Sequence, residues 1–372
     1  NGGWLRGYET IIPTSGAWNN FRGFHALSKD GTHWRRVSPG TAPESDDLLG
    51  LYNGKPYPFV DPPAPPQNRY KLFSATSVQA SDNGSDWDTV AEDMFPKKAY
   101  FPYGMDSHNK CFYDSRLEKY VAYVRVNKRY PVPAAREEYF AGLAKRLGAP
   151  GTYAMRAIGR SVTDKLSSFP MPEVVFEFDE KDPHFGGVSV TDFYTPEVVP
   201  YSHAQEAYYL FTSAYLHYED WYLSDDLSVY GRTSVGTLNA GPLHVGFAAS
   251  RDGVNWQLYD RTPWVALGPE GRFDCGSMYM CSGIFSHRDE IWMYYVGYDH
   301  RSRQPPQKRA QAHYEPGSPT EGSLHRGGDR LQRRGVHHLS GPLRRPGSSS
   351  EHRHFSSRYS SGGDPGYVRR SV

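Results

Sequence analysis

The chain repeats one seven-residue motif three times, as Ser28-Lys29-Asp30-Gly31-Thr32-His33-Trp34, Ser81-Asp82-Asn83-Gly84-Ser85-Asp86-Trp87 and Ser250-Arg251-Asp252-Gly253-Val254-Asn255-Trp256. Each copy follows an apolar or small-residue run and precedes a polar one, which is typical of a tight turn between two antiparallel strands. The third residue, Asp or Asn, caps the backbone of the turn, Gly takes a positive φ, and Trp packs back on the sheet. The motif therefore predicts three β-hairpins.

Strand hairpins that recur at intervals of several tens of residues predict a radial β architecture, the β-propeller. We expect an all-β, five-bladed propeller whose first and last blades are incomplete. The second blade is expected to begin at Asp61, after residues 56–60. The strand-like runs assigned to the five blades are 23–27; 69–74; 110–114, 119–125 and 156–161; 194–199, 207–213 and 245–250; 273–279 and 291–296. Residues 134–147 break this pattern, because their apolar side chains share one helical face, and they predict a short helical insertion packed on the rim.

The composition changes abruptly near residue 301. Residues 1–300 hold 28 Lys and Arg against 36 Asp and Glu, whereas residues 301–372 hold 14 against 5 and contain neither Trp nor Ile. Such a segment cannot bury enough apolar area to offset its ordering entropy. We expect residues 1–301 to form the propeller and 302–372 to be a disordered Arg/Gly/Ser-rich segment that looks frame-shifted. Binding of RNA or an acidic polymer by this basic segment is the alternative.

Several function classes find no support in the sequence. No apolar run approaches the roughly 20 residues of a membrane helix, and no signal-peptide pattern is present. The chain begins at Asn1 without Met, so we expect a truncated N-terminus. The compartment stays open, and a bacterial secreted or periplasmic protein is among the possibilities.

Three cysteines give no disulfide framework or C-x-x-C spacing. Without a metal-ligand cluster, phosphate loop or nucleic-acid motif, we expect no metal, no cofactor, and no nucleic-acid or membrane partner.

Acidic residues stand at the start of a predicted inner strand in four successive blades, at Asp61, Asp106, Glu197 and Asp274. Inner strands line the channel of a propeller, so these carboxylates are expected to converge on one mouth. Converging carboxylates raise each other's pKa, and a glycosidase needs one carboxylate ionised and another protonated. Turn or cap duty is the alternative for each, above all for Asp61 in Val60-Asp61-Pro62-Pro63.

Four runs resemble the five-bladed propeller glycosidases, in particular the bacterial proteins similar to glycoside hydrolase family 32, with kinship to family 43. They are Pro58-Phe59-Val60-Asp61-Pro62, Met105-Asp106-Ser107-His108-Asn109, Tyr194-Thr195-Pro196-Glu197 and Phe273-Asp274-Cys275-Gly276-Ser277-Met278-Tyr279. The resemblance covers about residues 20–300. It implies a nucleophile or base at Asp61, an orienting Asp at Asp106 and a general acid at Glu197. The family base usually lies in the first blade, so a nucleophile upstream of Asn1 is the alternative.

Secondary candidates for contacting a sugar flank these acids: His108, Asn109, Tyr103, Tyr194, Asp274 and Tyr279. The histidine and the asparagine are suited to bind hydroxyl groups or orient an acid, and the tyrosines to stack on a sugar ring. Asp192, close to Glu197 in sequence, either raises the pKa of Glu197 or caps a turn. The sequence thus predicts a glycoside hydrolase with a carbohydrate substrate; the alternative is a non-catalytic propeller that binds glycan or protein at the same mouth.

Overall fold

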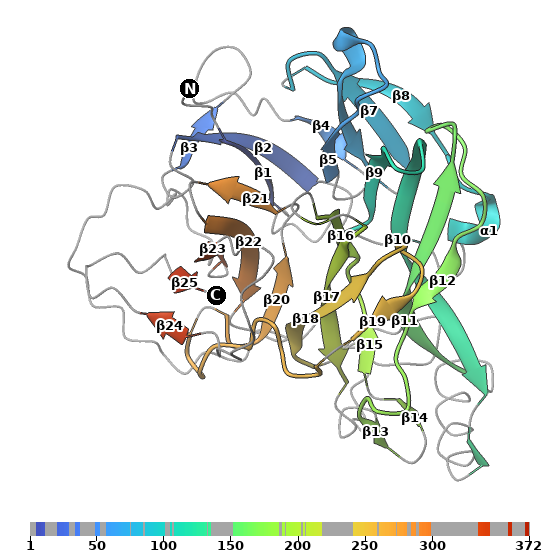
Figure 1. The fold of residues 1–372 in the computed structure, drawn as a ribbon, viewed down its shortest axis with the longest axis vertical. Coiled ribbons are helices and arrows are strands. Elements are labelled where there is room, and N and C mark those ends of the chain that lie inside the picture. Colours follow the sequence, from blue (N-terminus) through green and yellow to red (C-terminus); the bar gives the residue numbers. More distant parts are fainter. Residues whose placement is uncertain are drawn as a thin grey trace.

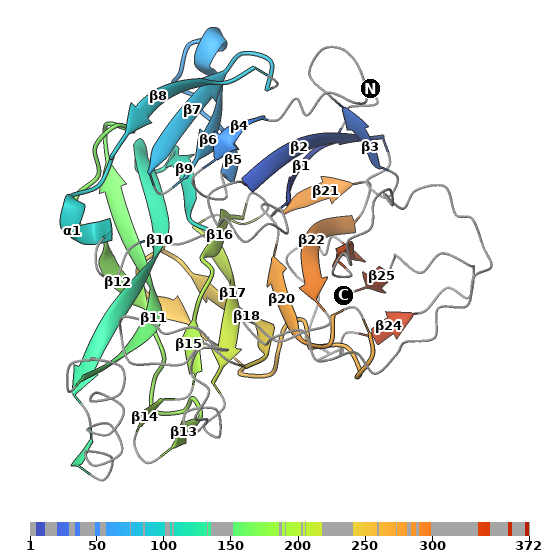
Figure 2. The same ribbon diagram turned by 180° about the vertical axis from the view of Figure 1, so that it is seen from behind.

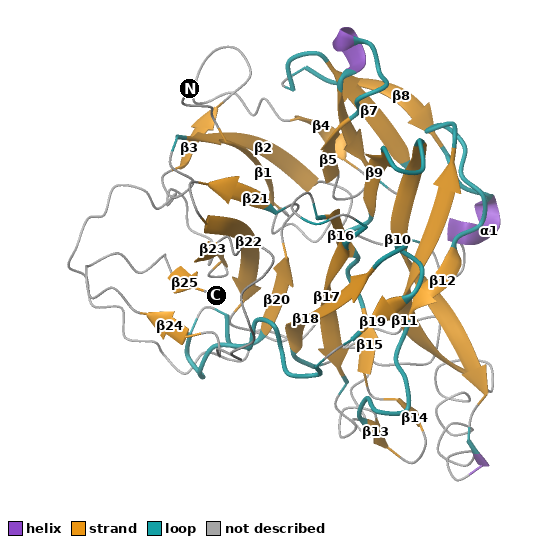
Figure 3. Ribbon diagram, in the orientation of Figure 1, coloured by secondary structure: helices purple, strands orange, loops and turns teal. Residues whose placement is uncertain are grey.

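The computed structural model of the chain is nearly all β (Figure 3). It describes residues 5–11, 21–29, 34–37 and 49–52; 57–134 except 75, 85, 101–104, 106, 107 and 132; 152–217 except 186, 187, 190, 202, 203 and 205; 241–298 except 259, 273, 281–283, 288 and 289; and 334–342, 356–358 and 369–371. The predicted helical insertion at 134–147 lies outside these residues apart from Ala134. No helix in the described part is long and apolar enough to cross a membrane.

Three sheets have four antiparallel strands each. The first contains β1 (Leu5–Ile11), β2 (Phe21–Ser28), β3 (Trp34–Val37) and β4 (Leu49–Tyr52). The second, in the order of the chain, contains β5 (Tyr57–Val60), β6 (Tyr70–Phe73), β7 (Ser77–Ser81) and β8 (Asp88–Glu92). The third contains β9 (Lys110–Asp114), β10 (Lys119–Pro131), β11 (Thr152–Thr163) and β12 (Glu173–Phe176).

A nine-stranded sheet follows, and it divides into two groups. The first group contains β15 (Thr191–Phe193), β16 (Glu197–Pro200), β17 (Tyr208–Leu216), β18 (Leu243–Ser250) and β19 (Trp256–Gln257). The second contains β20 (Ser277–Met280), β21 (Phe285–His287), β22 (Glu290–Tyr298) and β23 (Arg334–Pro342). A single parallel pair, Leu243 with Ser277, joins the groups, whereas the pairings inside each group are antiparallel.

Short elements complete the described part of the fold. They are the 3-10 helix η1 (Pro66–Asn68), helix α1 (Lys97–Tyr100), the pair β13 (His184–Phe185) and β14 (Val188–Ser189), and the pair β24 (Ser356–Arg358) and β25 (Arg369–Ser371). Figures 1 and 2 show the sheets from opposite sides, standing around the middle of the molecule, with β5, β9, β16 and β20 near the middle. The described residues therefore have the radial arrangement of sheets that the repeated motif predicts.

The structure differs from the sequence prediction over part of 302–372. Strands β23, β24 and β25 lie in this segment, which was expected to be disordered, and β23 pairs with β22 along all nine of its residues. The physical reason is that β22 offers a row of backbone donors and acceptors, and a strand can pair with such an edge whatever its side chains are. The boundary between the two parts of the chain near residue 301 stays a prediction.

The turn chemistry predicted from the repeated motif is confirmed in its third copy. The Ser250 hydroxyl accepts a hydrogen bond from the Gly253 amide (2.9 Å), and Asp252 Oδ1 accepts hydrogen bonds from the amides of Val254 (2.8 Å) and Asn255 (2.7 Å). Gly253 has a φ of 73°, in the left-handed region. The motif's Trp256 packs edge-on against Tyr123 of the neighbouring sheet. The hairpin thus joins β18 to β19 and also contacts β10.

The second copy repeats the same bonds. Ser81 Oγ accepts a hydrogen bond from the Gly84 amide (2.7 Å), Asn83 Oδ1 accepts one from the Asp86 amide (3.0 Å), and Gly84 has a φ of 71°. Asn therefore replaces Asp without changing the turn, because both side chains offer an oxygen to the following amides. The first copy lies mostly outside the described residues.

Three clusters of buried apolar side chains fill the spaces between sheets. One lies between the sheet of β9–β12 and the group of β15–β19, and it includes Tyr123, Ile158 and Leu210. A second lies between the two groups of the nine-stranded sheet, and a third lies between the sheets of β5–β8 and β9–β12. The apolar core thus consists of layers, each between two neighbouring sheets or groups of strands.

A left-handed conformation costs a residue with a Cβ atom about 1–2 kcal/mol. Gly253→Ala is expected to lower the free energy of unfolding by more than this, by about 2 kcal/mol or above. An added Cβ would lie 2.4 Å from Tyr123 Oη, which donates a hydrogen bond to the Gly253 carbonyl. Gly271→Ala is the matched control, because Gly271 also has a positive φ but nothing lies within 4 Å of its Cβ position. Urea unfolding measures both; equal losses would show that the contact with Tyr123 contributes nothing.

Candidate functional site

A buried ion pair joins the first residues of two neighbouring inner strands. Lys110 begins β9, Glu197 begins β16, and Lys110 Nζ lies 2.8 Å from Glu197 Oε1. Both side chains are almost completely buried, with 8% and 2% of their surface exposed. Each precedes two apolar residues of its strand: Cys111-Phe112 follows Lys110, and Val198-Val199 follows Glu197. These buried apolar residues form the strand and so fix the position of the charged group. A buried charged pair of this kind needs good geometry to offset its desolvation.

Tyr57, the first residue of β5, connects this ion pair to His108. The ammonium group of Lys110 lies 5.1 Å from the centre of the Tyr57 ring, within the range of a cation–π interaction. The hydroxyl of Tyr57 is hydrogen-bonded to His108 Nδ1 at 3.0 Å. His108 has a φ of 64°, an uncommon conformation for a residue other than glycine. The Tyr57 contact and the backbone conformation together fix the direction of the imidazole ring.

Half-buried rings extend the site from His108. The imidazole stacks on Tyr279 of β20, with ring centres 5.4 Å apart and planes 16° apart. Tyr279 meets Tyr194 edge-on at 6.2 Å. We call Tyr57, His108, Tyr194 and Tyr279 the ring cluster. Tyr57 begins β5, Tyr279 is the third residue of the four-residue strand β20, and His108 and Tyr194 lie in the segments before β9 and β16. Partly exposed aromatic rings beside polar groups suit the apolar face and the hydroxyls of a sugar.

A second buried charged group lies beside Tyr194. Asp192 Oδ2 is 2.8 Å from Arg156 Nη1 and 3.0 Å from His217 Nε2. The guanidinium carbon of Arg156 lies 4.9 Å from the ring centre of Tyr194 and 5.2 Å from that of Tyr215. Burial alone would raise the pKa of Asp192, but Arg156 and His217 together hold that pKa below its usual value. Asp192 is thus the centre of an ion-pair network, and the two roles predicted for it stay predictions.

This network predicts how stability depends on pH. Because the pKa of Asp192 is lower in the folded than in the unfolded chain, its contribution is present above the unfolded value of about 4 and is lost as the pH falls through the folded value. We expect the difference in melting temperature between the wild type and Asp192→Asn to be largest near neutral pH and to shrink below about pH 4. Thermal melting of both proteins between pH 3 and 7 measures it. A difference that stays constant across this range contradicts the assignment.

Asp61 lies in a different place from Glu197. It follows the last residue of β5, is buried, and pairs with Lys71 Nζ at 2.9 Å. Its two carboxylate oxygens accept hydrogen bonds from the Tyr120 hydroxyl at 3.1 and 3.3 Å. Tyr120 lies opposite Tyr113 of β9 in the sheet. Tyr113 follows Lys110 by three residues, a distance of about 10 Å along an extended strand. These contacts favour a role for Asp61 in holding two sheets together, and its predicted catalytic role stays a prediction.

The other predicted site residues divide into three groups. His108, Tyr194 and Tyr279 are brought together in the ring cluster, which also meets Glu197 through Tyr57 and Lys110. Asn109 Oδ1 accepts a hydrogen bond from the Arg125 amide, and buried Asp274 accepts one from the Tyr295 hydroxyl, so both bind parts of the protein. Asp106 and Tyr103 lie outside the described residues.

Sequence reasoning missed several residues of this site: Tyr57, Lys110, Arg125, Arg156, Tyr215 and His217. The sequence feature that could have indicated the two arginines is a cationic residue inside an otherwise apolar strand. Arg125 stands between Val124 and Val126, and Arg156 between Met155 and Ala157. A charge in such a position is seldom tolerated without a partner, so it indicates a buried ion pair or a site.

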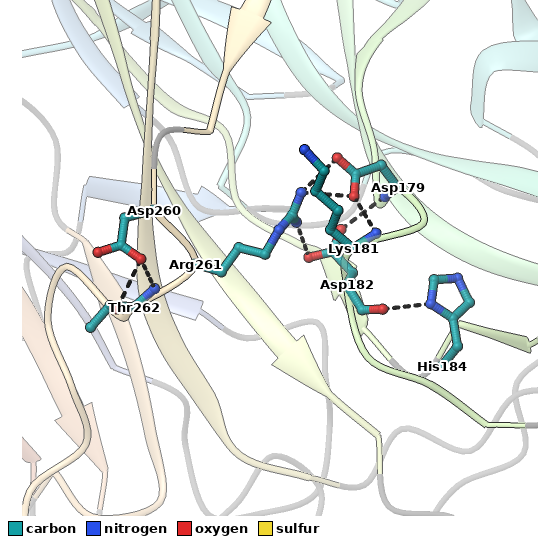
Figure 4. A network of polar contacts seen from close by, with 7 residues as sticks. All are labelled: Asp179, Lys181, Asp182, His184, Asp260, Arg261 and Thr262. Carbon is teal, nitrogen blue, oxygen red and sulfur yellow. Dashed lines mark hydrogen bonds and ion pairs between the residues drawn. The ribbon is translucent and has the colours of Figure 1, made fainter.

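Figure 4 shows a further polar network, which includes Arg261, Asp179 and Asp182 and none of the residues of the ring cluster. Arg261 Nη2 contacts both carboxylate oxygens of Asp179, at 2.7 and 2.6 Å, and its Nη1 contacts Asp182. This bidentate pairing ties the loop after β12 to the loop after β19, which is a structural function. Among the described residues, no group of three or more His, Cys, Asp or Glu side chains is placed to hold a metal ion.

Comparison with known proteins shows a similarity of fold. No sequence-family model matches the chain, and no curated protein matches it. Among solved structures, the chain is similar to a BT0996 RGII complex (TM-score 0.50, 11% identity, covering 86% of this chain and 89% of the other). It is also similar to a glycosyl hydrolase from Bacteroides ovatus (TM-score 0.47, 14% identity, 81% and 80%). At these identities the similarity concerns the fold alone.

Proposed function

We propose that the protein is a glycoside hydrolase that acts on an oligo- or polysaccharide. The observation that carries this proposal is the buried Lys110–Glu197 pair, at the starts of β9 and β16, beside the ring cluster, in which His108, Tyr194 and Tyr279 are half-buried. The rings of His108, Tyr194 and Tyr279 suit stacking and hydrogen bonding to a sugar, and the carboxylate supplies acid–base chemistry. A glycosidase-like fold supports the same function.

The proposed reaction uses two carboxylates. Asp61 or Asp106, ionised, removes a proton from the water that attacks the anomeric carbon, or itself attacks this carbon to form a glycosyl-enzyme ester that water then hydrolyses. Glu197, whose Oε1 lies 2.8 Å from Lys110 Nζ, acts as the general acid and donates a proton to the leaving glycosidic oxygen as the bond from carbon to oxygen breaks. The products are a free sugar and an alcohol. His108, bound by Tyr57, orients the sugar.

We infer five blades for the fold that carries this site. The sheets of β1–β4, β5–β8 and β9–β12 supply three, and the two groups of the nine-stranded sheet, joined by a single pair, supply two. In this arrangement β5, β9, β16 and β20 are inner strands of successive blades, which accounts for the meeting of Tyr57, Lys110, Glu197 and Tyr279 in one site.

A non-catalytic propeller that binds a glycan at the same place is the second candidate. One observation favours it: Glu197 and Asp61, two of the three carboxylates to which a catalytic role was given, each form an ion pair with a buried lysine. Carboxylates in such pairs commonly have structural functions. The ring cluster would serve a binding protein as well as an enzyme.

Turnover by the purified full-length chain distinguishes the two candidates. The wild type, Glu197→Gln and Asp106→Asn are assayed against aryl glycosides and plant and algal oligosaccharides, with thermal melting as the control for folding. Activity in the wild type that is lost in both variants at unchanged melting temperature supports the hydrolase. Glycan binding by well-folded wild-type protein without turnover supports the binding propeller.

A further inference from the structure

Two buried ion pairs hold the two ends of one short segment, residues 192–197. At its first residue, Asp192 Oδ2 lies 2.8 Å from Arg156 Nη1 of β11. At its last residue, Glu197 Oε1 lies 2.8 Å from Lys110 Nζ of β9. Strands β9 and β11 belong to the sheet of β9–β12, whereas the segment belongs to the next group of strands, β15–β19. The segment is therefore bound to the neighbouring sheet at both ends.

Tyr194, the member of the ring cluster in this segment, has a fixed backbone. Its amide donates a hydrogen bond to the Ser213 carbonyl of β17 (2.9 Å), and the next residue, Thr195, accepts one from the Ser213 amide through its hydroxyl (3.1 Å). Thr195 and Ser213 are both buried. The direction of the half-buried Tyr194 ring, in contrast, depends on the side chains around it.

The guanidinium group of Arg156 lies against this ring. Its carbon is 4.9 Å from the ring centre of Tyr194 and 5.2 Å from that of Tyr215, both within the range of a cation–π interaction. The two tyrosine rings are themselves neighbours, with centres 6.5 Å apart. A planar guanidinium group that contacts rings and also pairs with a carboxylate has a defined orientation. The orientation of Arg156 therefore bears directly on that of Tyr194.

Asp192 fixes the orientation of Arg156. Its Oδ2 accepts hydrogen bonds from Arg156 Nη1 (2.8 Å) and from the backbone amide of Arg156 (3.3 Å), so one carboxylate oxygen holds both the backbone and the end of the side chain. The same oxygen lies 3.0 Å from His217 Nε2, and the His217 ring lies 4.3 Å from that of Tyr215. Asp192 thus acts on the tyrosine rings through Arg156 and His217.

We propose that Asp192 is a positioning residue of the site, which holds Arg156 against Tyr194 and so fixes the angle at which Tyr194 meets Tyr279. These two rings meet edge-on at 6.2 Å. A consequence for sugar binding rests on the proposed function, in which the ring cluster binds the substrate, whereas the fixing of the Tyr194 ring does not. Asp192 therefore differs from Glu197, at the other end of the segment, which acts on the leaving group.

A fluorine label on Tyr194 tests the proposal without a substrate. The full-length chain carries 3-fluorotyrosine at position 194, and its fluorine NMR signal is recorded for the otherwise wild-type chain, Asp192→Asn and Arg156→Lys. We expect both variants to displace or broaden the signal, because the ring adopts other orientations. Arg156→Lys keeps a positive charge beside Asp192 but loses the planar group, and it decides the matter if Asp192→Asn does not fold.

Asp182→Asn is the matched control for this experiment. Asp182 is also a buried carboxylate paired with an arginine, Arg261, and neither residue belongs to the ring cluster. A signal that changes in Asp192→Asn and Arg156→Lys but not in Asp182→Asn supports the proposal. A signal that is unchanged in the folded variants, or that changes equally in Asp182→Asn, overturns it.

Steady-state kinetics separates this inference from the proposed function. On a glycoside that the wild type hydrolyses, we expect Asp192→Asn to raise KM about tenfold, the amount that one aromatic contact supplies, and to change kcat by less than about threefold. A loss of kcat at unchanged KM overturns the positioning role, because Asp192 would then act on the chemical step. If no glycoside is hydrolysed, the hydrolase proposal fails, and the fluorine signal still decides the role of Asp192.

Discussion

Glu197→Gln is expected to lower kcat on the best substrate by about 10²- to 10⁴-fold, the range that a positioned general acid contributes. The amide keeps the size of the side chain and can still accept a hydrogen bond from Lys110 Nζ, which lies 2.8 Å from Glu197 Oε1. It cannot deliver a proton to the leaving oxygen. KM is expected to change little, because the ring cluster that binds the sugar is left in place. Steady-state kinetics with an alkyl glycoside, whose leaving group needs protonation, measures both quantities.

The leaving group supplies a sharper test of the same prediction. A substrate with an activated aryl leaving group needs little protonation, so the loss in Glu197→Gln should be much smaller for it than for an alkyl glycoside of the same sugar. Glu173→Gln is the control, because Glu173 is exposed on β12 and the same atoms are exchanged there. Equal losses for both leaving groups would place Glu197 outside proton transfer, and an unchanged kcat would remove it from the mechanism.

The repeated motif explains why so much of the fold could be predicted from the sequence. Its turn geometry depends on Ser, Asp or Asn, and Gly within a few residues, so local chemistry is sufficient, as the bonds of Ser81 and Ser250 show. The strands around it have alternating or continuous apolar runs of the expected length. Strands such as β9 and β17 consequently lie within a few residues of their predicted bounds.

The site was harder to predict because it depends on which strand ends meet. Tyr57 and Asp61 are four residues apart at opposite ends of β5, and only the fold determines which of them reaches β16. The structure brings Tyr57 to Lys110 and places Asp61 beside Tyr120. The rule that an acid at a strand start faces the mouth therefore does not apply to Asp61, which follows the last residue of β5, Val60. Glu197, which does begin a strand, meets the ring cluster.

Cationic residues were missed for a related reason. An arginine in an apolar strand has no local partner, and its ion pair forms with a residue far away in the sequence, as Arg156 does with Asp192 across 36 positions. Periodicity indicates that such a charge is buried, but it does not indicate which acid or ring receives it. The same is true of Lys110 and Glu197, which are 87 positions apart.

Asp61→Asn is expected to lower the free energy of unfolding by about 3–5 kcal/mol, the cost of leaving one partner of a buried ion pair without the other. Lys71 and Asp61 have only 6% and 2% of their side-chain surface exposed, so water cannot solvate the remaining ammonium group. Burial and then the charge of Asp61 raise the pKa of Tyr120, which keeps its hydroxyl protonated as a donor to this carboxylate. The variant therefore weakens an ion pair within the sheet of β5–β8 and a hydrogen bond to Tyr120 of the neighbouring sheet.

Asp164→Asn is the matched control for this prediction. Asp164 also pairs with a lysine, Lys119, at 2.7 Å, but 74% and 41% of these side chains are exposed. Loss of an exposed pair costs about 0–1 kcal/mol, so urea unfolding should separate the two variants clearly. If Asp61→Asn unfolds like the wild type but loses turnover, Asp61 is the catalytic nucleophile that the family resemblance implies. A large loss of stability, with turnover retained by the protein that remains folded, makes Asp61 a structural residue and leaves Asp106 as the second carboxylate of the reaction.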